Sequence, residues 1–272
     1  MSVSDLGLVQ NRTLVMGILN VTPDSFSDGG LYASTSSAIE RGLVMVEEGA
    51  DIIDVGGEST RPNSERISLE EEADRVLPVV EALAKSGAIV SIDTTRAEIA
   101  KASFGVGAKI VNDISAGKYD SEMLSTVAKL NCPYIAMHTR GTSKTMNSMA
   151  VYSDVVKEVL VELSERVDAA LGAGISSLNI VLDPGIGFAK ESEHNWELLK
   201  HLSDLEKLNF PVLVGASRKR FLGALTGTTH TAERESASVA LTTLLAQRRT
   251  WGVRVHTVKP HVDAIKVVEM MR

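Results

Sequence analysis

Short apolar runs alternate with longer amphipathic segments along almost the whole chain. The runs are rich in Val, Ile and Leu, which is typical of strands buried on both faces of a parallel sheet. The longer segments repeat their apolar positions at helical spacing. We therefore expect eight strands, at residues 14–19, 52–55, 89–92, 110–111, 134–137, 179–182, 212–214 and 253–255. The eight expected helices are residues 35–48, 69–85, 96–104, 121–130, 152–171, 193–208, 232–248 and 260–271.

This alternation predicts an α/β fold, a (β/α)8 TIM barrel with one domain. A doubly wound open sheet is the second architecture to consider, because it has the same order of elements. The length of 272 residues suits one barrel-sized domain. We find no linker that divides the chain, and we assign residues 1–272 to one domain with a short N-terminal extension at 1–12.

Polar residues follow every expected strand, whereas the segments that lead into the strands are ordinary helix stops. Barrel active sites form at the carboxyl ends of the strands, in the loops that run on to the next helix. Any one of these groups suits a turn or a helix cap, but all eight strand ends carry one. The sequence therefore predicts an active site at this rim. The residues concerned are Asn20, Glu58, Ser59, Thr60, Arg61, Asp93, Asn112, His138, Asp183, Ser217, Lys219 and His256.

The loop at residues 20–30 is unusually long for a connection between a strand and a helix. It carries Phe26, Ser27 and Asp28 and ends in two glycines. A solvated surface loop would have a similar polar composition. An isolated aromatic side chain among polar ones better suits a lid, and we expect this segment to close over a loaded site.

Three of the rim groups suit a planar nitrogen heterocycle. Asp93 and Asp183 would accept hydrogen bonds from N–H groups, and the Asn112 amide both donates and accepts. Lys219, after the seventh strand, would donate to a carbonyl oxygen or a ring nitrogen. Asp113 better suits a cap on the following helix.

A second group is cationic. Arg254 and His256 are two residues apart near the end of the last strand, so they share a face. Arginine suits phosphate binding, and the chain has no phosphate-loop motif, so these side chains would bind a diphosphate directly. Asn20 would add a ligand to Mg²⁺, which relies largely on substrate phosphates. Pairing of Arg254 with a neighbouring acid is equally open.

A third group would line a site for a second substrate. It combines Thr60, Arg61 and Pro62 of the second loop with Phe26 and Ser27 of the first. The guanidinium of Arg61 would suit a carboxylate.

Composition narrows the classes of partner. The net charge of −7 gives no reason to expect nucleic acid or an anionic membrane surface. We see no signal peptide and no apolar run long enough to span a bilayer, so we expect a cytoplasmic protein. The single cysteine, Cys132, excludes an internal disulfide and a cysteine-based zinc site.

Seven motifs occur in the order found in the dihydropteroate synthases, and from Thr13 onward the chain closely resembles that family. Together they are far more specific than any one glycine-rich piece. The motifs are MGILNVTPDSFSDGG (16–30), DVGGESTRP (54–62), SIDT (91–94), NDIS (112–115), LDPGIGFAK (182–190), GASRK (215–219) and RVH (254–256).

The resemblance implies a barrel, usually dimeric, that makes 7,8-dihydropteroate for folate synthesis. It condenses 6-hydroxymethyl-7,8-dihydropterin diphosphate with 4-aminobenzoate, requires Mg²⁺, and is expected to bind sulfonamides as competitors of aminobenzoate. The implied order is loss of diphosphate, then attack by the aryl amine on a cationic carbon.

The resemblance also implies roles for individual residues. The implied catalytic residues are Asp28, Asp93, Lys219 and Arg254. Those implied for pterin diphosphate are Thr60, Asp93, Asn112, Asp183, Lys219, Arg254 and His256, with Asn20 for the metal. Those implied for aminobenzoate are Phe26, Ser27, Thr60, Arg61, Pro62, Phe188 and Ser217.

Three positions depart from the family pattern. Thr139 and Ser143 stand where Met and Pro are common, and Thr257 replaces a common Asp after His256. These changes concern loop five and the support of His256. Two other functions stay open: a methyltetrahydrofolate:corrinoid methyltransferase-like barrel, which has no need of a diphosphate site, and a non-catalytic paralogue.

Overall fold

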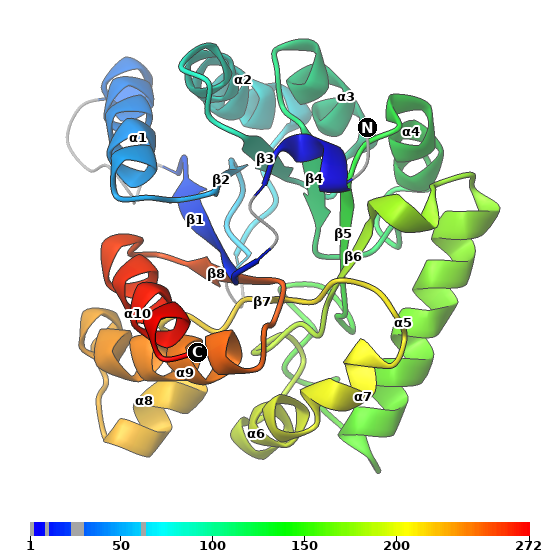
Figure 1. The fold of residues 1–272 in the computed structure, drawn as a ribbon. Coiled ribbons are helices and arrows are strands. Elements are labelled where there is room, and N and C mark those ends of the chain that lie inside the picture. The colour runs from blue at the N-terminus through cyan, green and yellow to red at the C-terminus, as the bar shows by residue number, and fades with distance from the viewer. Residues whose placement is uncertain (1–2, 9–10, 23–29, 61–63) are drawn as a thin grey trace.

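The computed structural model describes residues 3–8, 11–22, 30–60 and 64–272. Its strands form one parallel sheet in the order β6-β5-β4-β3-β2-β1-β8-β7. A parallel bridge between Leu182 and Val212 joins the two ends of this order and closes the ring (Figure 1). The sheet is therefore a barrel, and the open doubly wound sheet is excluded. The strands are β1 (Leu14–Asn20), β2 (Ile52–Gly56), β3 (Val90–Asp93), β4 (Ile110–Asp113), β5 (Tyr134–Met137), β6 (Ile180–Asp183), β7 (Leu213–Val214) and β8 (Gly252–Val255).

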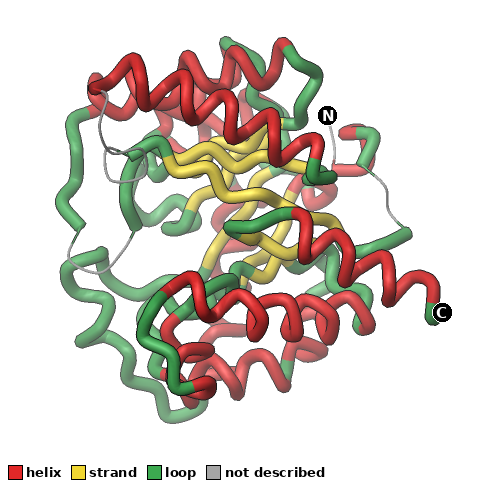
Figure 2. Tube along the Cα trace, turned by 90° about the vertical axis from the view of Figure 1, so that its left-hand side faces the viewer, coloured by secondary structure: helices red, strands yellow, loops and turns green. Residues whose placement is uncertain are grey.

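Helices surround the strands, and the view from the side shows them flanking the sheet (Figure 2). The expected helix at 193–208 is two helices that meet at His201, and α8 was not expected. Within the described ranges, no helix has both the length and the apolar character needed to cross a membrane. The helices are α1 (Gly30–Glu47), α2 (Leu69–Lys85), α3 (Ala97–Gly105), α4 (Met123–Leu130), α5 (Val155–Gly172), α6 (Ser192–Lys200), α7 (Leu202–Glu206), α8 (Arg220–Thr226), α9 (Glu235–Gln247) and α10 (Lys259–Met270). Short 3-10 helices are η1 (Val3–Leu6), η3 (Ser177–Asn179) and η4 (Thr231–Arg234).

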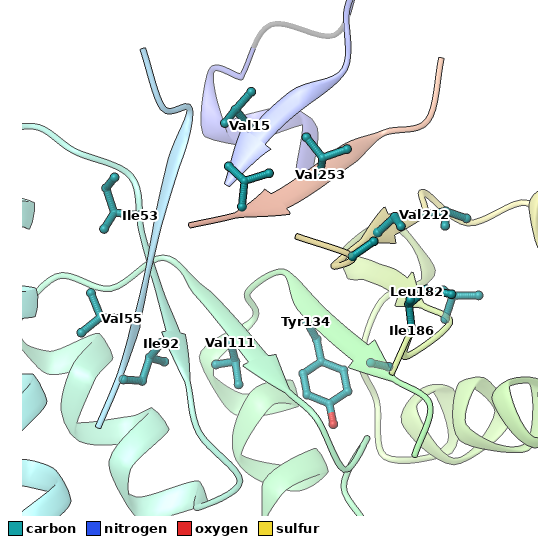
Figure 3. Packing of buried hydrophobic residues seen from close by; sticks show 14 of the residues in the cluster. Val15, Ile53, Val55, Ile92, Val111, Tyr134, Leu182, Ile186, Val212 and Val253 are labelled. Atoms are coloured by element: carbon teal, nitrogen blue, oxygen red, sulfur yellow. The ribbon is translucent and has the colours of Figure 1, made fainter. Parts of the chain in front are cut away.

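The larger part of the core lies between the strands and the helices. Alternate strand residues such as Val15, Ile53, Val111 and Val253 point outward into it, and all are buried (Figure 3). Because successive strand residues face opposite sides, the residues between them point into the barrel.

A second, smaller cluster fills one end of the barrel interior, and we call it the barrel floor. Residues of the N-terminal segment, including Val3, Leu6 and Leu8, pack against it, and η1 lies across that end of the ring (Figure 1). The barrel is thus filled and apolar on the side opposite the rim. The floor consists of Met16, Ile52, Ile110, Ile135, Val181 and Leu213.

Candidate active site

The strands that carry the floor also carry the polar layer above it. Asp54, Asn112 and Asp183 each follow a floor residue by two positions on the same strand, so they share its inward face. All three are buried, with 0%, 4% and 5% of their surface exposed. Period-two alternation therefore places carboxylates and an amide directly over an apolar base.

Arg254, on β8, pairs with two carboxylates in this layer. Its Nε donates to Asp54 Oδ2 at 2.6 Å and its Nη2 donates to Asp93 Oδ2 at 2.7 Å. Burial acts to lower the pKa of Arg254, but the charges of Asp54 and Asp93 outweigh it and the pKa is raised. Of the two interpretations that the sequence left open, the pairing with acids is present. This pairing orients the guanidinium inside the mouth of the barrel, by which we mean the open end at the carboxyl ends of the strands.

Asp54 is a site residue that the sequence reasoning did not single out. Its Oδ2 also accepts from Asn112 Nδ2 at 2.9 Å. A carboxylate can only accept, so the amide turns its nitrogen toward Asp54 and keeps its oxygen as an acceptor for another donor. The signal in the sequence was a charged residue within an otherwise apolar strand. Within the described residues, Asp54 Oδ1 is buried and has no hydrogen-bond partner.

Asp93, at the end of β3, has a carboxyl group that titrates near neutral pH. Burial raises the pKa of its carboxyl to about 7, although the positive charge of Arg254 opposes this. An N–H donor or a positive charge bound beside it would favour the ionised form. Asp93 is therefore a group whose charge responds to what occupies the mouth.

Asp183 and Lys219 face the same interior from β6 and from the loop after β7. Asp183 Oδ1 accepts from the Gly185 backbone N–H at 2.7 Å, and burial raises the pKa of this carboxyl. Burial and then the charge of Arg254 lower the pKa of Lys219 to about 8. The Lys219 Nζ lies 4.1 Å from the centroid of the Phe188 ring, which is a cation–π contact. The structure thus brings together all four residues predicted for the heterocycle, Asp93, Asn112, Asp183 and Lys219, around Arg254.

Ser217 and His256 lie side by side at the ends of β7 and β8. Ser217 Oγ is 3.1 Å from His256 Nδ1. Ser217 is buried and His256 is partly exposed. Residues predicted for two different substrates are therefore in direct contact.

Asn20 ends β1 and pairs in register with Gly56 of β2, at the carboxyl edge of the barrel. Thr60 follows β2 and is partly exposed. Both lie on the predicted rim. The other predicted loop residues, Phe26, Ser27, Asp28, Arg61 and Pro62, are outside the described residues.

Asp113 has a structural role, but it is not the expected helix cap, because α4 begins at Met123 with Glu122 as its N-cap. The Asp113 carboxylate accepts from the backbone N–H groups of Ser115 and Gly117 at 2.8 and 2.7 Å, and from the hydroxyl of Tyr134 at 2.8 Å. It therefore stabilises the fourth loop and is not available to a ligand.

The three departures from the family pattern are accommodated. Ser143 Oγ donates to the Ser64 carbonyl oxygen at 3.1 Å, which ties loop five to loop two, and Thr139 is buried. Thr257 Oγ1 accepts from Arg218 Nη2 at 2.5 Å. Arg218 in turn pairs with Glu235 of α9 at 2.6 Å, and the negative charge of Glu235 acts on His256.

A metal would find few protein ligands at this mouth. The described residues contain no group of three or more His, Cys, Asp or Glu side chains placed to hold a metal ion. This donor set does not fit an ion held entirely by protein. It does fit Mg²⁺ bound by one amide oxygen, from Asn20, together with substrate phosphates and water.

Comparison with known proteins agrees with this geometry. The pterin binding enzyme family matches residues 16–256. The chain is 48% identical over 260 residues to the dihydropteroate synthase of Mycobacterium leprae, covering 93% of this chain and 92% of that one. The solved structure of Xanthomonas albilineans dihydropteroate synthase with 4-aminobenzoic acid superposes with a TM-score of 0.92, at 43% identity and over 97% and 94% of the two chains. Yersinia pestis dihydropteroate synthase in complex with a sulfonamide drug gives 0.91, at 40% identity and over 97% and 96%. The chain belongs to the dihydropteroate synthase family of pterin-binding enzymes.

Proposed function

We propose that this protein condenses 6-hydroxymethyl-7,8-dihydropterin diphosphate with 4-aminobenzoate to give 7,8-dihydropteroate and diphosphate. The observation that carries the proposal is the convergence of Asp93, Asn112, Asp183 and Lys219 around Arg254 in one closed-bottomed mouth. The two carboxylates and the amide oxygen match the N–H groups of a reduced pterin. The ammonium of Lys219 matches its carbonyl oxygen or a ring nitrogen.

The diphosphate would leave at the cationic side of the mouth. Arg254 and His256 would bind it, and Asn20 would hold Mg²⁺ against the same oxygens. Bound Mg²⁺ would neutralise negative charge on the leaving group. The bond between the pterin methylene carbon and the diphosphate oxygen breaks, and its electron pair leaves with the oxygen.

The carbon left behind is cationic, and the nearby carboxylates stabilise it. Asp93 lies at the mouth beside Arg254. The family resemblance implies the same role for Asp28 of the first loop. The amine of aminobenzoate then donates its lone pair to the carbon and loses a proton. Exclusion of water is needed because water would otherwise capture the cation.

The aminobenzoate would lie above the pterin, beside Phe188 and Ser217. Thr60 lies on the same rim and would contact both substrates. Phe26, Ser27, Arg61 and Pro62 complete this side as predictions from the sequence. A sulfonamide drug is bound in the Yersinia pestis relative, which supports sulfonamides as competitors here.

The two other functions are less well supported. A corrinoid methyltransferase needs the pterin groups but not a diphosphate site, and Arg254 with His256 at the mouth favours the synthase. A non-catalytic paralogue would be expected to lack one of these groups, and the sequence retains Asp93, Asn112, Asp183, Lys219, Arg254 and His256. The proposal also includes a cytoplasmic location, one domain over residues 1–272 and a homodimer.

Diphosphate release is the test. Purified protein is mixed with the pterin diphosphate and Mg²⁺, and released diphosphate is followed by a coupled assay with and without aminobenzoate. We expect release that depends on aminobenzoate, with dihydropteroate as product. Pterin binding without release would favour a binding protein, and transfer of a methyl group to a corrinoid would favour the methyltransferase.

A further inference from the structure

Lys190 is a buried ammonium outside the residues that face the substrates. It follows the turn after β6 and is 8% exposed. Its Nζ lies 2.8 Å from His138 Nδ1, 3.0 Å from the Phe188 carbonyl oxygen and 3.1 Å from the Gly185 carbonyl oxygen. An ammonium has three N–H donors, so each has an acceptor within the protein. This is a site built around one cation.

His138 links this cation to a carboxylate. Its Nε2 lies 3.1 Å from Glu162 Oε2, and Arg140 donates to the other oxygen of Glu162 at 2.9 Å. Burial acts to raise the pKa of Glu162, but the hydrogen bonds from His138 and Arg140 outweigh it and lower the pKa to about 2. The ionised carboxylate can only accept, so Nε2 carries the ring proton.

One further proton then lies between His138 Nδ1 and Lys190 Nζ. Burial and then the charge of Lys190 lower the pKa of His138 to about 4, whereas burial lowers that of Lys190 to about 7. The proton therefore rests on Lys190, and between about pH 4 and about pH 7 the pair carries a single positive charge.

Lys190 holds the turn from Asp183 to Phe188 at two points, the carbonyl groups of Gly185 and Phe188. The Gly185 carbonyl accepts from Lys190, and the Gly185 N–H donates to Asp183 Oδ1 at 2.7 Å. Gly185 has φ +67°, and a Cβ on it would lie 1.9 Å from the His138 carbonyl oxygen, so the turn tolerates no side chain there. The Phe188 carbonyl also accepts from Lys190, while its ring contacts Lys219.

We propose that Lys190, together with His138, is a positioning residue that holds Asp183 and Phe188 toward the substrates and keeps a positive charge beside Asp183. The inference rests on the proposed function, since Asp183 faces the pterin and Phe188 the aminobenzoate. Lys219, Arg254 and Lys190 are the cations that act on Asp183. The first two face the mouth, whereas all three N–H groups of Lys190 are bonded within the protein, so it acts on the ligand only through the turn.

Lys190→Met tests this, because it keeps the length of the side chain and removes its charge. We expect binding of the free pterin, measured by calorimetry, to weaken about tenfold at neutral pH. We also expect the acid limb of pterin binding to move up by about one pH unit, because Asp183 loses a nearby cation and protonates more readily. The KM for aminobenzoate should rise through Phe188.

Lys200→Met on α6 is the matched control, since Lys200 is 69% exposed and its nearest carboxylate, Glu197, is 3.8 Å away. It should leave both the affinity and the pH profile unchanged. If Lys190→Met does not fold, His138→Leu tests the positioning role: it leaves the ammonium one acceptor short but keeps its charge, so we expect weaker binding of both ligands with the acid limb unmoved.

Wild-type binding of both ligands by both variants would overturn the inference. If Lys190→Met lost pterin affinity equally at every pH, the charge effect would be overturned and only a packing role would remain. Failure of the wild-type protein itself to bind pterin or release diphosphate would instead overturn the proposed function, and this inference with it.

Discussion

Ser217 Oγ accepts the backbone N–H of His256 at 3.3 Å and lies 3.1 Å from Nδ1 of the same residue. The Ser217 hydroxyl donates to Nδ1 when the ring proton of His256 is on Nε2, and this tautomer directs the Nε2–H to a ligand. Burial, and then the charges of Arg254 and Arg218, lower the pKa of His256 to about 3, so the ring is neutral near neutral pH.

His256 should thus contribute one neutral hydrogen bond to the diphosphate. We expect His256→Ala to weaken diphosphate binding by about 1 kcal/mol, the usual range for a neutral hydrogen bond. The loss should be the same at about pH 5.5 and about pH 8, since the ring does not titrate between them. Calorimetry at both pH values measures this, and a loss confined to the acid side would show that the imidazolium is the binding form.

Asp93 should be a site where function opposes stability. Its pKa of about 7 lies above the ordinary value of 3.8, so the folded state binds a proton more readily than the unfolded state between these values. Stability from this group is present at low pH and is lost as pH rises through about 7. We expect Asp93→Asn to have a higher melting temperature than wild type at about pH 8, and a smaller difference or none at about pH 5.

The same variant should bind pterin more weakly, because a donor replaces an acceptor that faces an N–H group. An unpaired donor costs about 1–3 kcal/mol. Asp183→Asn provides the comparison on the other side of the ring. Unchanged pterin affinity in both variants would remove these carboxylates from the site.

Arg254 should show two separable effects. Arg254→Ala leaves Asp54 and Asp93 as buried charges without their partner, and breaking a buried pair typically costs about 3–5 kcal/mol. Arg254→Lys keeps the charge but not the two-armed geometry that reaches both acids. We therefore expect it to fold, and to lose affinity for the diphosphate substrate far more than for free pterin. Equal losses for both ligands would show that Arg254 serves the fold alone.

Asn20 should affect the metal and not the pterin. We expect Asn20→Ala to raise the Mg²⁺ concentration that gives half-maximal diphosphate release, because one protein ligand of few is lost. Binding of free pterin, which has no phosphate, should be unchanged. A variant with wild-type Mg²⁺ dependence would place the ion elsewhere.

The barrel could be predicted because its strands are buried on both faces and appear as continuous apolar runs. Helix α8 could not, because its seven residues, with a glycine among them, are too few to show a helical repeat of apolar positions. The break at His201 was also invisible, since the apolar pattern continues across it. In these places tertiary packing decides the structure.

The rim residues were predictable one at a time, but their partners were not. Asp54 looks like part of a strand until closure of the barrel brings Arg254, 200 residues later, against it. The pairing of Lys190 with His138 likewise depends on two loops that meet only in the folded state. Sequence patterns indicate which faces are polar, and long-range contacts decide which polar groups share a proton or a charge.

The filled floor of the barrel has a consequence for how substrates enter and products leave. Met16, Ile52 and their neighbours are buried and fill that end of the barrel, so we expect substrates to enter and products to leave at the rim. In the proposed arrangement, the pterin would lie next to the floor and the aminobenzoate nearer the rim. Aminobenzoate that binds first would therefore block the entry of the pterin diphosphate. We expect excess aminobenzoate to slow turnover, and added pterin diphosphate to relieve the block.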